Sequence, residues 1–94
     1  MPRFQVAHLR EQGVDLVIVP LDSAFRYKSL ADQQKVTAEL QVHARAAGLA
    51  GTVVPVWDNG WGRMGFLAPG HWHSFFSSLS LRAVAVNINR EIYW

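Results

Sequence analysis

The sequence predicts an α+β fold. The expected sheet is mostly antiparallel with about five strands, ordered ββαββα plus a C-terminal strand, and it carries two helices on one face. Paired β-branched segments with turn signals between them, one long segment of helical periodicity, and an alternating tail support this prediction. A length of 94 residues fits a single domain over residues 1–94.

The first hairpin is predicted from "RFQVAHL" and "VDLVIVPL". The first segment alternates between apolar and polar residues, and "REQG" supplies a turn that ends at Gly13. The second segment is β-branched on both faces, which is typical of a strand in the middle of a sheet.

The segment "LADQQKVTAELQVHARAAG" predicts the longest helix. Ser29 and Asp32 have the spacing of a capping box at its start. Val36, Leu40 and His43 recur at helical spacing, and Gly48 can end the helix. On the apolar face of a helix, His43 is expected to be a packing residue.

A second hairpin is predicted over residues 52–67, because Asn59-Gly60 is a strong signal for a type I′ turn. That turn would pair residue 57 with residue 62. Trp57 would then face the core, while Trp61 would share a mixed face with Asp58 and Arg63. In this register the backbone nitrogen of Pro55 points away from the hairpin partner, so residues 52–58 are expected to form an open sheet edge.

The C-terminal third predicts a short helix and then a strand. In "HWHSFFSSL" the apolar residues Trp72, Phe75, Phe76 and Leu79 follow helical spacing. Over residues 80–94 the β-branched residues alternate with polar ones, which favours a strand. A helix also fits this tail, because Leu81, Val84, Ala85 and Ile88 follow helical spacing.

The composition restricts the class of protein. Hydrophobic residues make up 50% of the chain and charged residues 17%, which indicates a folded domain. The chain has no cysteine, no signal-peptide pattern and no apolar run of membrane-spanning length, so a cytoplasmic protein without membrane contact is expected. A domain this short often gains stability by pairing with a second copy, so a homo-oligomer is expected.

No motif for catalysis or metal binding is present. His71 and His73 could share a metal on an extended segment, with His8 or His43 as a third ligand, but acidic partners at ligand spacing are missing. The sequence contains no GxSxG, P-loop or GxGxxG pattern. We therefore expect no metal and no cofactor. A non-catalytic protein is favoured over a small enzyme with a histidine-containing cleft.

The favoured function is binding, either to a protein partner or to a second copy, through an exposed Trp/Arg hairpin and the adjacent sheet edge. Trp and Arg are over-represented at interface hot spots. The expected binding residues are Asp58, Trp61, Arg63, His71, Trp72 and His73. The alternative is a single-stranded nucleic-acid-binding protein, which the net charge of +2 permits. The basic and aromatic residues that would carry it are Phe25, Arg26, Tyr27 and Lys28.

Overall fold

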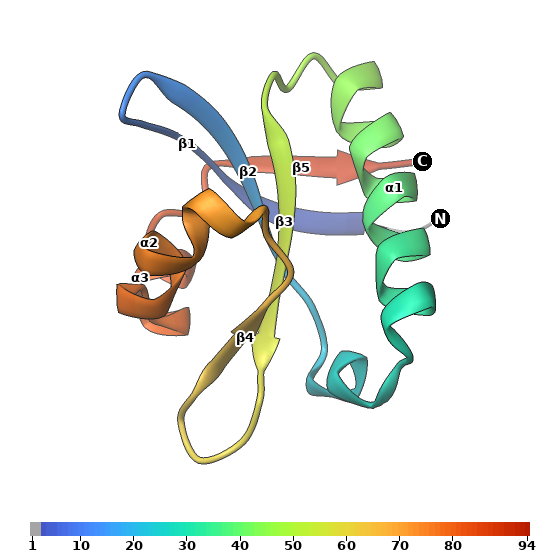
Figure 1. The fold of residues 1–94 in the computed structure, drawn as a ribbon. Helices are drawn as coiled ribbons and strands as arrows, with labels where there is room; N and C mark the ends of the chain where they lie inside the picture. The colour runs from blue at the N-terminus through green and yellow to red at the C-terminus, as the bar shows by residue number, and fades with distance from the viewer. Residues whose placement is uncertain (1–2) are drawn as a thin grey trace.

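The computed structural model describes residues 3–94, which form a five-stranded sheet with helices on both faces (Figure 1). The strands are β1 (Arg3–Glu11), β2 (Val14–Pro20), β3 (Thr52–Asp58), β4 (Met64–Phe66) and β5 (Arg90–Tyr93). The α-helices are α1 (Leu30–Ala46), α2 (His73–Ser78) and α3 (Leu81–Val86). Two short 3-10 helices, η1 (Ser23–Tyr27) and η2 (Gly70–Trp72), precede α1 and α2.

The strand order is β4-β3-β2-β1-β5, and every neighbouring pair except β2 and β3 is antiparallel. The predicted α+β class and the mostly antiparallel five-stranded sheet are therefore confirmed. The parallel pair was not predicted. It arises because α1 carries the chain from the end of β2 back to the start of β3, as a parallel connection requires.

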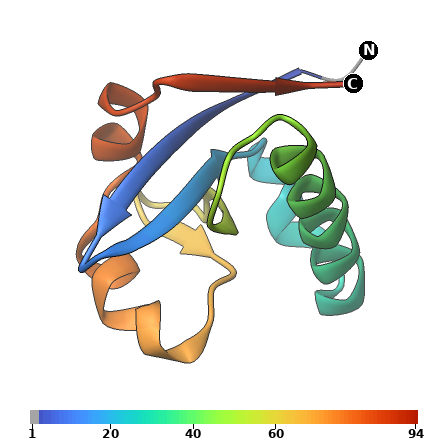
Figure 2. The same ribbon diagram turned by 90° about the horizontal axis from the view of Figure 1, so that it is seen from above.

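The helices lie on opposite faces of the sheet, so the prediction that both lie on one face is wrong (Figure 2). Strand residues alternate between the two faces, and both faces are apolar. Leu40 and Ala44 of α1 pack with Val17, Val53 and Ile92. The other face carries the second core cluster, in which Ala7, Leu16, Ile18, Val54 and Val56 pack with Trp72 and Phe76 of the η2–α2 segment and Val84 of α3.

The start and end of α1 follow the sequence prediction. The Ser29 hydroxyl accepts a hydrogen bond from the Asp32 N–H at 3.1 Å, and Gly48 has a φ of 80° just beyond the helix. Gln41 fastens the helix to β3, because its side-chain amide donates to the Gly51 carbonyl at 2.9 Å and accepts from the Val53 N–H at 2.8 Å.

The β3–β4 hairpin differs from the prediction in its register. Trp57 pairs with Gly65, not with residue 62, and the turn lies at Trp61-Gly62, whose φ values are 55° and 72°. Positive φ at both central residues is the feature of a type I′ turn that was expected at Asn59-Gly60. The register differs by an odd number of residues, so Met64 and Phe66 lie on the face opposite to the predicted one.

β3 is an inner strand that pairs with β4 over residues 56–58, so this part of the range 52–58 is not an open edge, and the Val53 N–H donates to the Gln41 side chain. The carbonyl of Pro55 accepts from the Leu67 N–H at 3.2 Å, which places the ring nitrogen of Pro55 on the β4 side as well. The missing donor therefore faces the hairpin partner, contrary to the prediction. Since that reciprocal hydrogen bond cannot form, the ladder ends there, and β4 is only three residues long.

The tail contains both of the elements that its pattern allowed. Ser80 caps α3 by accepting from the Ala83 N–H at 3.1 Å, and β5 follows after Asn89. Asn89 acts as an extra strand residue, because its side chain accepts from the His8 N–H at 2.8 Å and donates to the His8 carbonyl at 3.0 Å.

Candidate binding surface

Two segments that are distant in the sequence meet at the carboxyl ends of β2 and β3. Because these strands are parallel neighbours, the segment after β2 and the turn after β3 emerge at the same edge of the sheet. Figure 1 shows the β3–β4 hairpin extending beyond the body at the end where η1 and the start of α1 lie. The "FRYK" segment and the Trp61 turn, predicted as alternative sites, are therefore neighbours.

Phe25 and Trp57 join the two segments from inside. Their ring centroids are 5.0 Å apart, and both side chains are buried, Trp57 being 6% exposed. The prediction that Trp57 belongs to the core is confirmed. Phe25 packs η1 against Trp57, and because its side chain is buried it has little surface that a partner could contact.

Arg26 joins the two segments on the outside. Its guanidinium lies over the Tyr27 ring, 4.7 Å from the centroid, and donates to the Tyr27 hydroxyl. A Cβ at Gly60 would lie 2.8 Å from Nη1 of Arg26, so glycine permits this close approach. The Nε of Arg26 is buried and has no hydrogen-bond partner within residues 3–94. Arg26 is thus held between η1 and the turn.

Trp61 is the most exposed large apolar residue of the described chain, with 100% of its surface accessible. Its backbone has a φ of 55°, a left-handed conformation that non-glycine residues adopt at a cost of about 1–2 kcal/mol. Asp58 fixes the loop, because its side chain accepts from the Gly60 N–H at 2.9 Å. A tight, hydrogen-bonded turn therefore presents a bare indole to solvent.

We call the side chains gathered at this end the tip surface. It consists of Arg26, Tyr27, Asp58, Trp61 and Arg63. Lys28, also predicted, borders a different hollow beside Asp22 and Val36, on the α1 side. The tip surface carries two exposed aromatic rings and two guanidinium groups against one carboxylate.

The predicted HWH residues do not join the tip surface. Trp72 is 5% exposed and packs in the second core cluster, so it is a core residue. His73 shares a hydrogen bond of 3.0 Å with the Ala68 carbonyl and meets the Phe66 ring edge-on. These contacts lie at the end of β4 and just after it. Ser77 of α2, not the histidines, borders the same hollow as Arg63.

His8 and His43 also have structural partners. His8 shares a hydrogen bond of 2.8 Å with the Ala50 carbonyl, and His43 stacks flat on Trp94 with ring centroids 3.8 Å apart. Within the part of the chain that the structure describes, no group of three or more His, Asp or Glu side chains could hold a metal ion. Among the same residues, no helix is long and apolar enough to cross a membrane.

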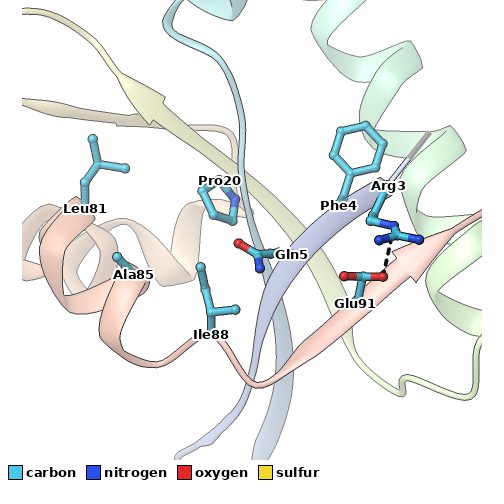
Figure 3. Close-up of a pocket in the computed structure, with 8 residues that line it drawn as sticks. All are labelled: Arg3, Phe4, Gln5, Pro20, Leu81, Ala85, Ile88 and Glu91. Carbon is cyan, nitrogen blue, oxygen red and sulfur yellow. Dashed lines mark ion pairs between the residues drawn. The ribbon is translucent and has the colours of Figure 1, made fainter. Parts of the chain in front are cut away.

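A further hollow of about 600 Å³ lies between α3 and the β1–β5 pair (Figure 3). Leu81, Ala85 and Ile88 form its wall, and the charged residues Arg3 and Glu91 form an ion pair of 3.2 Å at one end. α3 does not cover this part of the sheet. The sheet therefore contacts solvent here, which explains its polar side chains. Arg3 and Glu91 neutralise each other's charge. The described residues that line the hollow do not bring a nucleophile and a base together.

The chain was also compared with known proteins. No family model, curated protein or solved structure matches it.

The sequence indicated only part of this surface. Asp58, Trp61 and Arg63 were predicted as one cluster, and the structure keeps them at the end of one hairpin. Arg26 and Tyr27 were assigned to a separate alternative because the parallel β2–β3 pairing was not foreseen. The Gly-Trp-Gly sequence around residue 61 was the one available signal that the turn is centred on Trp61.

Proposed function

We propose that this protein is a small, non-catalytic binding module whose contact surface is the tip surface. The observation that carries the proposal is the complete exposure of Trp61 on a backbone of positive φ. A large indole in water contributes no burial energy to the fold, and its backbone conformation costs free energy. Such a residue is best explained by a contact that it makes with another molecule.

The neighbouring side chains support the same proposal. Trp, Tyr and Arg are the residues that contribute most to hot spots, and the tip surface contains each of them. Asp58 and Arg26 hold the loop in place before any partner arrives, which lowers the conformational entropy lost on binding. The proposal retains the cytoplasmic location expected from the sequence.

The proposal is tested by capture from an extract of the source cells. The wild-type protein and a Trp61→Gly variant are immobilised, and the captured proteins and nucleic acids are both quantified. We expect Trp61→Gly to lose the captured partner, because it removes the indole. The turn should keep its conformation, since glycine readily adopts a positive φ.

Val42→Ala is the matched control, since Val42 is 64% exposed but lies on α1, outside the tip surface. It should capture the same partner as the wild type. Capture that is unchanged in Trp61→Gly would contradict the proposed function.

A further inference from the structure

We propose that the tip surface binds single-stranded nucleic acid, with a base stacked on Trp61 and a phosphate group on Arg63. This inference rests on the proposed function, because it names the partner of the same surface. Three features support it: a hollow beside the turn, the arrangement of the aromatic rings and the charge of the surface.

The hollow has a volume of about 390 Å³ and lies where the turn meets the C-terminal end of α2. Arg63 is the one charged residue among those that line it, and Phe66 and Leu79 supply apolar surface. Ser77, which is exposed, adds a hydroxyl group on the far side. A cation, a hydroxyl and an apolar wall suit a phosphate with its attached sugar and base.

Trp61 provides a stacking platform beside this hollow, and Tyr27 provides a second exposed ring on the α1 side of the turn. Trp61 is fully exposed and is joined to the hollow through Gly62, which lines it. Tyr27 is 76% exposed, with the Arg26 guanidinium over its ring, and Arg26 also contacts the turn at Gly60. Every base has a π-face, so platforms of this kind bind unpaired bases with little sequence preference.

The charge and the exposed rings together favour a single strand over the other classes of partner. The guanidinium groups of Arg26 and Arg63 outnumber the carboxylate of Asp58, which suits a polyanion. An acidic polypeptide would match the charge but would leave the exposed indole without a planar partner. A duplex keeps its bases stacked internally, so it cannot use Trp61 as a platform.

The experiment measures the fluorescence anisotropy of a fluorescein-labelled 15-mer of thymidylate at 50 mM and 200 mM salt. We expect the wild-type protein to bind it, with an affinity that is lower at the higher salt concentration. Trp61→Gly and Arg63→Gln should each weaken binding about tenfold or more, because they remove the stacking platform and the phosphate contact. Arg45→Gln, which makes the same charge change on the last turn of α1, should alter the affinity less than twofold.

Three results would overturn the inference. The first is the absence of oligonucleotide binding at 50 mM salt. The second is an equal loss of affinity in Arg45→Gln and Arg63→Gln, which would indicate diffuse attraction by net charge. The third is equally strong competition by polyglutamate, which would indicate an acidic protein as the partner. If any of these occurs while extract capture still depends on Trp61, the proposed function stands and only the nucleic-acid partner is excluded.

Discussion

The indole of Trp57 lies across Gly65, its Cα partner in the β3–β4 ladder. A Cβ at position 65 would overlap the indole ring, which also packs on the buried ring of Phe25 and donates from its N–H to the Asn59 side-chain oxygen at 3.4 Å. The absence of a side chain at Gly65 thus creates the space in which the Trp57 indole packs. This pair also fixes the register that places Trp61 at the turn.

Gly65→Ala should therefore lower the free energy of unfolding by about 1–3 kcal/mol, as overpacking of a core does. Gly70→Ala is the control, since a Cβ at position 70 meets nothing within 4 Å. Urea unfolding of the two variants checks the prediction. Equal stability of both variants would show that Trp57 does not pack on Gly65.

The two tryptophans of this hairpin should differ in their contribution to stability. Trp57→Ala should cost about 3–5 kcal/mol, because it leaves a cavity in the core. Trp61→Gly should change the free energy of unfolding by less than about 1 kcal/mol, since relief of the left-handed backbone offsets the greater entropy of the unfolded chain. Similar losses in both variants, measured by urea unfolding, would refute the assignment of Trp57 to the core and Trp61 to the surface.

Asn89→Ala should lower the free energy of unfolding by about 1–2 kcal/mol, because both hydrogen bonds to the His8 backbone are lost. Hydrogen exchange should also show faster exchange of the His8 amide proton. Asn87→Ala is the comparison, since the Asn87 side chain donates locally, to the Ala83 carbonyl of the helix that it follows. An unchanged exchange rate at His8 would contradict the role given to Asn89.

We also expect the protein to self-associate, now through β5 and not through residues 52–58. β5 is an outer strand, and Tyr93 is 65% exposed on it. Sedimentation equilibrium should show a mass that rises with concentration, and Tyr93→Lys should shift it toward the monomer. A monomer mass at every concentration would refute self-association.

The features that follow from neighbouring residues could be predicted from the sequence. The cap at Ser29, the end of α1 at Gly48 and the burial of Trp57 all follow from local pattern or from side-chain character. Helical spacing placed Trp72 and Phe76 on one apolar stripe, which indicates the burial that the structure shows, so the assignment of Trp72 to the binding residues went against that pattern. The tail satisfied two periodicities because it contains two elements.

The errors came from contacts between distant segments. The Asn59-Gly60 signal is strong in isolation, but the fit of Trp57 over Gly65 and the approach of Arg26 to Gly60 favour another register. β2 and β3 are apolar on both faces and are separated by a helix, which is the pattern of a parallel pair, but the pattern alone does not show which strands become neighbours. Without that pairing, the two halves of the tip surface could not be joined from the sequence.

The pairing of β1 with β5 bears on how the chain folds during synthesis. Arg3 pairs with Tyr93, and β1 and β5 are the first and last of the described strands, so their ladder can form only after the other described strands have been synthesised. Until then Val6 lacks Ile92, its partner in the first core cluster, and one edge of β1 is open. A nascent chain held on the ribosome would therefore expose this edge to other chains for longer than any other part of the sheet.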